Sequence, residues 1–220
     1  MAKEMLVFQD LVLRANRGSL QAVRTALLDH TAAPWKHADE REKEISVHSA
    51  PGHDVVAFTR EKGDGIEAVG LLLWSEGASY KVTNIVPRDV GELGFEAYNA
   101  ALQDFVSRVV EPARQVASFQ IAITPERQSL NDWVSSDMAE ALSRFSSLAN
   151  KSTGSSHPLD RQRWFAFLFL AHRSSEPLDT DRLMRWLVEV ENWPEEKAHD
   201  LAIQYEFGLD LLKAYDSRRA

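Results

Sequence analysis

The residues best suited to binding chemistry lie in a short polar loop, residues 150–156, that leads into the most apolar segment of the chain. Short hydrogen-bonding side chains surround Gly154, and Pro158 follows where a helix would begin, because its missing N–H costs nothing in a first turn. The free N–H groups of a helix N-terminus bind anions. The sequence therefore predicts a candidate anion site made of Lys151, Ser152, Thr153, Gly154, Ser155, His157 and Arg161.

The same residues suggest two alternatives to this anion site. A phosphate-binding P-loop needs Gly-x-x-x-x-Gly-Lys-Ser/Thr after a strand. Here Lys151 precedes Gly154 and a predicted helix precedes the loop, so the P-loop is excluded. A plain interhelical loop with good capping and a solvated basic first turn is the simpler explanation of these residues, and the anion site stays open beside it.

A second candidate site is an acidic surface on the last helices of the chain. Its carboxylates are Glu189, Glu191, Glu195, Glu196, Asp200, Glu206 and Asp210. Trp193 stands among these acids, and aromatic residues are frequent anchors of protein interfaces. The partner-binding residues predicted from this pattern are Trp193, Glu195 and Glu196. Such a surface suits a basic protein partner, as a toxin-neutralising or immunity protein would have, whereas solubility is the simpler explanation.

No complete catalytic, metal or cofactor motif is present in the sequence. The histidines stand at positions 30, 37, 48, 53, 157, 172 and 199, without the His-x-x-x-His or His-Glu-x-x-His spacing of zinc sites. Ser155, His157 and Asp160 are close in sequence, but a catalytic triad requires an orientation in space that spacing alone does not supply. We therefore expect no metal and no cofactor, and the catalytic residues stay unknown.

The composition limits which kinds of binding partner and which cellular compartment we expect for this chain. The net charge of −8 and the pI of about 5.4 suit a basic partner better than the phosphates of a nucleic acid. The absence of cysteine excludes disulfides and thiol chemistry and fits a reducing cytoplasm. The apolar run 164–171 is far too short to span a bilayer, and the N-terminus lacks the features of a signal peptide. We expect a cytoplasmic protein with a protein partner, no nucleic acid and no membrane; its oligomeric state is open.

The first part of the chain, residues 1–130, is predicted to be an α+β region. Residues 4–30 are interpreted as two helices joined at a turn, with Ser19 as the N-cap of the second. Residues 31–44 are interpreted as a connector in which Trp35 anchors onto the core. The predicted strands are 45–49, 54–60, 67–75, 79–86 and 119–124, mostly as an antiparallel meander. An amphipathic helix from about residue 95 to 111 covers this sheet.

The segment 79–124 carries a strand, a turn with Arg88, Gly91 and Gly94, a helix and another strand. With the strands before it, this order resembles the core topology of GNAT acyltransferases over residues 54–124. In that family the turn reads Gln/Arg-x-x-Gly-x-Gly/Ala and holds the pyrophosphate of acetyl-CoA through backbone N–H groups. This chain follows the pattern as far as Gly91, carries Leu93 at the last position and has Glu92 where the pyrophosphate would lie. The unit would be a right-handed crossover if its two strands were parallel neighbours.

The second part, residues 131–220, is predicted to be a bundle of four helices around a buried central helix, 158–172. The predicted fold class is α+β, a mostly antiparallel sheet with a covering helix followed by a C-terminal helical bundle, both in one compact unit. The function that we expect is a non-enzymatic, acidic protein-interaction module that neutralises or regulates a basic partner. The alternative is a binder of a phosphate-bearing small molecule, or a GNAT-like acyltransferase with a degenerate cofactor loop.

Overall fold

The chain has an α+β fold, as the sequence predicts, in the computed structural model, which describes residues 3–16, 19–48, 53–89 and 91–219. It divides into two compact units. The sheet unit is Val7–Glu126, and the helical unit joins Met1–Leu6 to Arg127–Ala220. The division between residues 126 and 127 lies close to the predicted boundary after residue 130, but the first six residues belong with the second unit. That the two units form one compact body stays a prediction.

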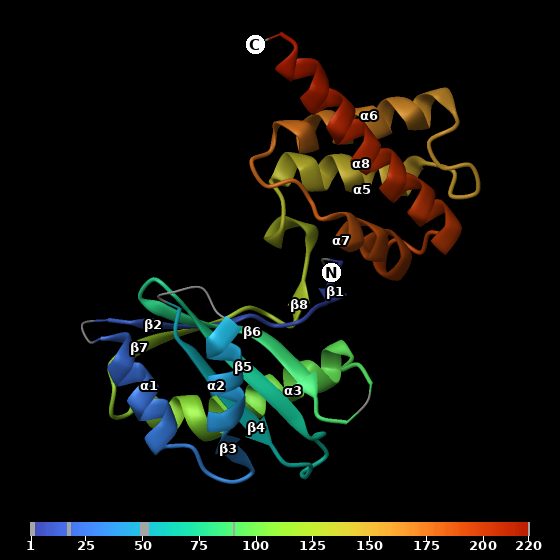
Figure 1. The fold of residues 1–220 in the computed structure, drawn as a ribbon. Helices are drawn as coiled ribbons and strands as arrows, with labels where there is room; N and C mark the ends of the chain where they lie inside the picture. The colour runs from blue at the N-terminus through green and yellow to red at the C-terminus, as the bar shows by residue number, and fades with distance from the viewer. Residues whose placement is uncertain (1–2, 17–18, 49–52, 90, 220) are drawn as a thin grey trace. The chain divides into compact units, whose positions relative to one another are not determined.

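The main sheet of the sheet unit is antiparallel throughout and has the strand order β3-β4-β5-β6-β2-β7. Its strands are β2 (Leu11–Ala15), β3 (Trp35–His37), β4 (Val55–Arg60), β5 (Val69–Glu76), β6 (Ser79–Pro87) and β7 (Phe119–Ile123). The predicted meander is confirmed as β4, β5 and β6, which pair in chain order (Figure 1). Short turns join them, and Gly77 adopts a φ of 58° at the second turn.

The predicted first helix is wrong, because residues 5–14 are extended. They contain β1 (Met5–Leu6) and most of β2. The odd-numbered residues from Met5 to Leu13 are buried and the even-numbered ones are more exposed, which is the period of a strand rather than of a helix. The second predicted helix is confirmed as α1 (Leu20–Asp29), and the hydroxyl of Ser19 caps it by accepting from the N–H of Ala22.

The condition for a right-handed crossover, that β6 and β7 are neighbouring strands, is not met. β2 lies between β6 and β7 and pairs antiparallel with both of them. β2 therefore separates β6 from β7 in the sheet, so these two strands do not pair with each other. Because β2 was interpreted as a helix, no strand was available to occupy this position.

The helix predicted over residues 95–111 is confirmed and is longer than expected. It consists of α3 (Phe95–Phe105), the π-helical turn η1 (Val106–Val110) and α4 (Glu111–Arg114). Pro112 does not end the helix, because it stands in the first turn of α4, where its missing N–H is tolerated. Buried residues of α1 and of this helix share one hydrophobic core with the inner face of the sheet, so these helices cover it.

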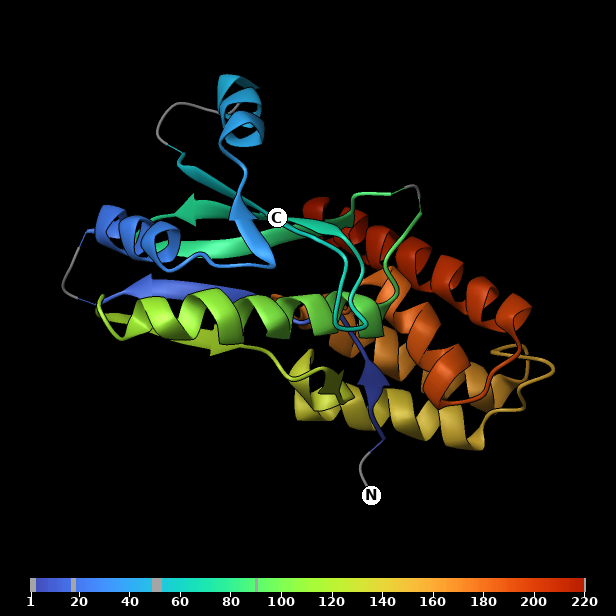
Figure 2. The same cartoon turned by 90° about the horizontal axis from the view of Figure 1, so that it is seen from below.

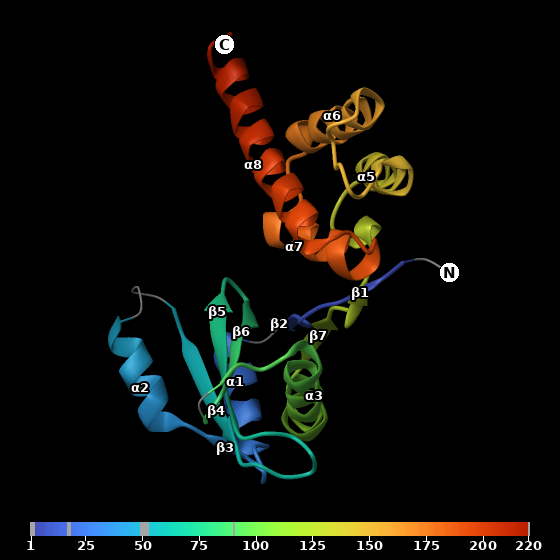
Figure 3. The same cartoon turned by 90° about the vertical axis from the view of Figure 1, so that its right-hand side faces the viewer.

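Residues 39–48 form helix α2 (Asp39–His48), which corrects both the predicted connector over 31–44 and the predicted strand over 45–49. Residue 49 lies outside the described residues. Figures 2 and 3 show α2 on the side of β4 and β5 away from α3. Trp35 is confirmed as a core anchor, since it is buried in β3 and its ring meets Phe105 edge-on.

A β-bulge changes the face pattern predicted for β6. Leu72 opposes Asn84, whereas Leu73 opposes Val82, so Thr83 is the extra residue of this strand. Simple alternation predicts that Tyr80, Val82, Asn84 and Val86 share a face. After the bulge Ile85 is the buried residue and Val86 is exposed.

The helical unit begins with a short strand pair and continues as a helical bundle (Figures 1 and 3). β1 pairs antiparallel with β8 (Arg127–Gln128), and a 3-10 turn η2 (Leu130–Asp132) follows. The helices are α5 (Ser136–Leu148), α6 (Pro158–Arg173), α7 (Thr180–Arg185) with its π-helical extension η3 (Trp186–Val190), and α8 (Glu195–Ser217). Asp179 is the N-cap of α7, and its carboxylate accepts a hydrogen bond from the N–H of Arg182 at 3.1 Å.

Aromatic side chains form the centre of this bundle. Trp164 and Phe167 of α6 are buried, and they contact Phe145 of α5 and Tyr205 of α8 respectively. The prediction that α6 is buried all round is wrong, because Phe165 and Phe169 are half-exposed. One side of α6 faces the core and another faces the surface, so its continuous apolar run does not make it a fully enclosed helix.

Candidate functional site

The polar loop singled out in the sequence connects α5 to α6. Gly154 has a φ of 63°, the left-handed region that glycine adopts without strain, and its N–H donates to the carbonyl of Asn150 at 2.9 Å. His157 is the N-cap of α6 and Pro158 is its first residue, as predicted. The candidate anion-site residues are therefore gathered around the N-terminus of one sixteen-residue helix.

Two of these candidate residues are bound to other helices of the unit. The ammonium group of Lys151 donates to the carbonyl of Glu191, which follows η3. The hydroxyl of Ser155 donates to Oε1 of Gln204 in α8 at 2.6 Å. These bonds tie the loop to the C-terminal part of the bundle, so Lys151 and Ser155 have structural partners before any ligand is considered.

The other candidates are bonded within the loop or to the first turn of α6. The hydroxyl of Ser152 donates to Oδ1 of Asn150 at 2.8 Å, and that of Thr153 donates to the Asn150 carbonyl at 3.3 Å. The guanidinium of Arg161 donates to the carbonyl of Ser156 at 3.0 Å. A bound anion would therefore compete with existing hydrogen bonds for most of the predicted side chains.

Asp160 decides the electrostatics of this helix N-terminus. Its carboxylate is buried in the first turn of α6, where a negative charge is favourable to the helix dipole. It accepts from the backbone N–H of Asn150 at 3.3 Å and from the guanidinium of Arg163 at 2.6 Å. An anion bound here would share the helix N-terminus with a negative charge that belongs to the chain itself.

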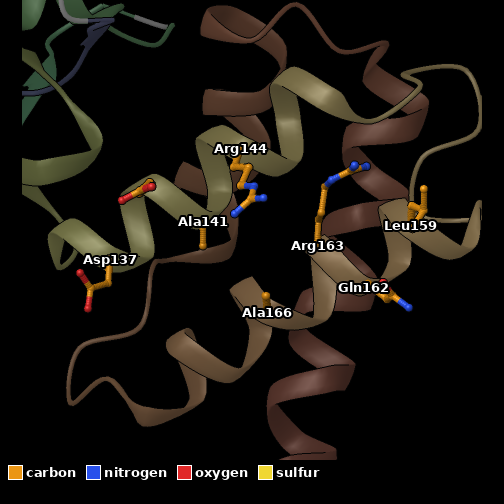
Figure 4. A pocket seen from close by; sticks show the side chains of 8 residues that line it. Asp137, Ala141, Arg144, Leu159, Gln162, Arg163 and Ala166 are labelled. Carbon is orange, nitrogen blue, oxygen red and sulfur yellow. The ribbon is translucent and has the colours of Figure 1, made fainter.

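Two hollows adjoin this region. One, of about 720 Å³, is lined by Thr153, His157, Asp160 and Arg163 together with parts of α5 and the loop. The other, of about 450 Å³, lies between α5 and α6, and Figure 4 shows side chains entering it from both helices. It is lined by Asp137, Glu140, Ala141, Arg144, Leu159, Gln162, Arg163 and Ala166. Carboxylates and guanidinium groups line both hollows, so the lining suits a polar ligand that carries both signs of charge.

The predicted partner anchor Trp193 is buried rather than exposed, which corrects that part of the acidic-surface hypothesis. Its ring stacks on Phe145 with a centroid separation of 5.4 Å, and its indole N–H donates to the hydroxyl of Ser146 at 2.7 Å. A Trp with its N–H satisfied inside a core is a packing residue. It is therefore not available to a partner in this structure.

Glu191, one of the acids counted in the predicted surface, is also buried. Its carboxylate pairs with the ammonium of Lys3 at 2.7 Å, and its Oε1 atom has no hydrogen-bond partner among the described residues. Burial of an ionised group requires such a counter-charge. Glu191 therefore holds the N-terminal segment to the helical unit instead of contributing to an open acidic face.

The predicted partner-binding residues Glu195 and Glu196 are exposed in the first turn of α8. Glu206 and Asp210 follow at positions that a helical period places toward the same side. Among the described residues Glu195 and Glu206 form no ion pair. Within the part of the chain that the structure describes, Glu196 and Asp210 pair only with local lysines, at 3.6 Å and 3.8 Å. This side of α8 therefore presents carboxylates that the chain neutralises weakly.

The sheet unit contains a separate cluster of ionised groups at the open edge of β4. The carboxylate of Glu42 accepts from the backbone N–H of Ala57 at 3.3 Å and contacts His37 at 2.8 Å, and Arg24 donates to it as well. Arg24 also donates to the carbonyl of Val55 at 3.0 Å. The cluster supplies partners to backbone groups that β3 leaves unpaired, which is a structural role at a sheet edge.

A second buried ion pair fastens the hairpin 61–66 to α3. The fully buried Arg60 donates to Asp104 at 2.8 Å, and Trp35 and Arg108 donate to the same carboxylate. Burial alone would raise the pKa of Asp104, but the hydrogen bonds from Arg60, Arg108 and Trp35 outweigh it and hold that pKa below its ordinary value. This group is committed to its three donors and is not free for chemistry.

The turn that resembles the cofactor loop of GNAT acyltransferases lies before α3. Gly91 has a φ of 144°, and Gly94 is the N-cap of α3. Glu92 is exposed, and residue 90 of the motif lies outside the described residues. This turn belongs to the sheet unit, whereas the loop 150–156 belongs to the helical unit.

Neither a metal site nor a membrane-spanning helix is found among the described residues, and no known protein matches the chain. Within the described residues no cluster of three or more His, Asp or Glu side chains is placed to hold a metal ion, and no helix is long and apolar enough to cross a membrane. Comparison with models of protein families, with curated proteins and with solved structures finds no match. Functional inference therefore rests on the residues and their geometry.

Sequence reasoning missed the exposed apolar residues of the last helix. Ile203, Phe207, Leu211 and Tyr215 are exposed, while the core side of the same helix is formed by other residues. Their four-residue spacing is visible in the sequence. It was overlooked because the stripe that builds the core (Ala198, Leu201, Ala202, Tyr205 and Leu209) accounts for the helix by itself.

Proposed function

We propose that the chain is a non-enzymatic, cytoplasmic protein-interaction module that binds a basic protein through the acidic side of α8. The observation that supports this proposal is the set of exposed carboxylates at Glu195, Glu196, Glu206 and Asp210, which local lysines neutralise only weakly. Carboxylates without internal counter-charges attract basic surfaces and accelerate their association. The net charge of −8 adds to this attraction over the whole chain.

The hypothesis drawn from the sequence used Trp193 as the anchor residue of the interface, and the proposal made from the structure does not. Trp193 and Glu191 are buried, so the surface consists of the helix α8 itself and not of the segment before it. A partner would then meet a single rigid helix face, and its lysine or arginine side chains would pair with carboxylates spaced along about four turns. In this proposal the chain itself is of an antitoxin or immunity type, and the partner that it neutralises or regulates is a basic protein.

The test is charge reversal at the start of α8. The variant Glu195→Lys/Glu196→Lys should weaken binding of a lysine-rich helical peptide, measured by calorimetric titration at low salt. Replacing two attractions with two repulsions should cost about 1–3 kcal/mol, which corresponds to a roughly 5- to 150-fold increase in Kd. The matched control is Glu76→Lys/Glu92→Lys, because both residues are exposed in the sheet unit and the net-charge change is the same. Equal weakening in both variants would show a net-charge effect and would contradict the proposed surface.

A second candidate function is supported by the hollow of about 720 Å³ beside the loop 150–156, which Thr153, His157 and Arg163 help to line. It would hold a phosphate-bearing small molecule, and the turn 88–94 is the other place where such a ligand, acetyl-CoA included, would bind. A thermal-shift screen against inorganic phosphate, nucleotides and acetyl-CoA separates these ideas, since a ligand at 100 times its Kd adds about 2.7 kcal/mol. A shift that Lys151→Ala/Arg161→Ala removes would assign the loop, and a shift that the variant retains would exclude it.

A further inference from the structure

Helix α8 has an apolar side in addition to the one that packs in the bundle. Ala198, Leu201, Ala202, Tyr205 and Leu209 face the core. Ile203, Phe207, Leu211 and Tyr215, each four residues from the next, are between 53% and 68% exposed. Figures 1 and 3 show α8 lying against α6 and α7, with its remaining surface uncovered by the other helices of the unit. We refer to these four residues as the outer stripe.

An exposed row of this length needs an explanation. Single exposed apolar residues are normal on protein surfaces, but four large ones in line along one helix form a continuous patch. A helix that is apolar on two sides normally has both of them covered. The outer stripe therefore indicates that something packs against α8 when the protein is in its working state.

The charges at the two ends of the stripe identify what would cover it. Asp200 precedes the stripe and Arg218 follows it, and a helical period places both on the stripe side of α8. The spacing is seven residues from Asp200 to Phe207, four from Phe207 to Leu211 and seven from Leu211 to Arg218. The spacing is therefore the same when it is read from either end. Ile203 and Tyr215 also lie at equal distances from its midpoint, which is Leu209.

We propose that a second copy of this chain docks on the outer stripe, with the two α8 helices antiparallel about a two-fold axis at the level of Leu209. In this arrangement Phe207 meets Leu211 of the second copy, and Ile203 meets its Tyr215. Asp200 meets Arg218 of the second copy, once at each end. A parallel arrangement would instead place Asp200 against Asp200 and Arg218 against Arg218. The charges therefore favour the antiparallel pair, which is the isologous contact of a symmetric dimer.

The end charges are available for this contact. Asp200 is half-exposed and has one partner within its own chain, the ammonium of Lys197 at 3.1 Å. A carboxylate accepts several hydrogen bonds, so Arg218 of the second copy would add to this pair and not replace it. The Arg218 guanidinium forms no ion pair among the described residues, whereas its neighbour Arg219 donates to the hydroxyl of Tyr215 at 2.8 Å. Glu195 and Glu206 of the acidic side lie outside the outer stripe, so the dimer leaves them open, whereas Glu196, seven residues before Ile203, lies on the stripe side.

The experiment is a charge swap read by light scattering behind size exclusion, from nanomolar to high micromolar concentration. Asp200→Arg places two arginines together at both ends of the interface and should raise the dimer Kd at least tenfold. Arg218→Asp should do the same with two carboxylates. The double variant Asp200→Arg/Arg218→Asp restores opposite charges at both ends and should return the Kd to that of the unmodified chain. Because the double variant recovers dimerisation, a folding defect does not explain the loss in the single ones.

Further variants complete the test. Leu211→Glu should abolish the dimer, and Asp181→Arg, an exposed change of the same charge in the first turn of α7, should leave it intact. A chain that is monomeric throughout the concentration range would overturn the proposal, as would a dimer that survives Leu211→Glu. A dimer lost in both single variants and not recovered in the double one would overturn the antiparallel register. None of these measurements requires a basic partner, so their outcome is independent of the proposed function.

Discussion

At the scale of single residues, Glu42 is the clearest example of a charge used for structure. It is buried, and it accepts hydrogen bonds from Arg24, from His37 and from the backbone N–H of Ala57. Burial alone would raise its pKa, but the hydrogen bonds from His37 and Arg24 outweigh burial and lower the pKa below the ordinary value of 4.5. A lowered pKa in the folded state means that ionised Glu42 stabilises the fold above the unfolded pKa. That stability is lost as the pH falls through the folded pKa.

The prediction is that Glu42→Gln lowers the free energy of unfolding of the sheet unit by about 1–3 kcal/mol at neutral pH, because donors around the site lose their charged acceptor. The variant should also lose less additional stability than the unmodified chain when the pH falls below about 4.5. Urea unfolding at a series of pH values measures both effects. Glu40→Gln is the control, since Glu40 is exposed on the same helix. Identical pH profiles for the Glu42 variant and the unmodified chain would contradict this role.

Burial of individual polar and aromatic residues was the least predictable feature of the candidate site. Trp193 stands among acids in the sequence, yet it packs on Phe145 inside the bundle. Glu191 is buried because its counter-charge, Lys3, comes from 188 residues away. Neighbours in sequence report the local polarity of the chain, whereas burial depends on partners that only the tertiary fold supplies. By contrast the N-cap Ser19 of α1 and the start of α6 at Pro158 are local signals, and the sequence located them.

At the scale of elements, the local signals that the sequence carries strongly were interpreted correctly. The meander β4–β6, the covering helix α3 and the helices α5 to α8 follow turn residues, caps and helical periodicity. The errors lie where two patterns overlap. Residues 5–13 alternate with period two, but Phe8, Leu11 and Val12 also fit the i, i+3, i+4 spacing of a helical face. Helix α2 carries almost no apolar pattern. The buried carboxylate of Glu42, rather than a hydrophobic stripe, attaches it to the sheet at Ala57.

The close approach of α6 and α8 depends on a glycine. A Cβ atom built at Gly208 would lie 3.0 Å from Cδ1 of Leu168. We therefore expect Gly208→Val to force the two helices apart and to destabilise the helical unit by about 1–3 kcal/mol, as overpacking does. Thermal unfolding followed by circular dichroism measures this change. Valine has a higher helix propensity than glycine, so propensity alone predicts a slight gain in stability for this substitution. An unchanged or raised melting temperature would contradict the role of the contact with Leu168.

At the scale of the whole molecule, the order of the chain does not match the order of its units. The first residues belong to the helical unit, where β1 pairs with β8 and Arg185 donates to the carbonyl of Leu6 at 2.8 Å. The chain then builds the sheet unit and returns. Sequence reasoning assigned the N-terminus to the sheet region because sequential neighbours usually pack together. The pairing partner of Met5 is Gln128, so no local pattern pointed to it.

Removing residues 1–6 should therefore destabilise the helical unit more than the sheet unit. Glu191 would keep a buried carboxylate without its Lys3 counter-charge, and breaking a buried pair in this way costs several kcal/mol. Because Lys3 is itself 57% exposed, we expect a smaller loss of about 1–3 kcal/mol. Hydrogen exchange measured peptide by peptide separates the units, with faster exchange expected in α5 and α6 and unchanged exchange in β4 and β5. The single variant Lys3→Ala should reproduce part of the effect, and Glu4→Ala should not. Equal loss of protection in both units would instead mean that they unfold together, which would support one compact body in place of two separable units.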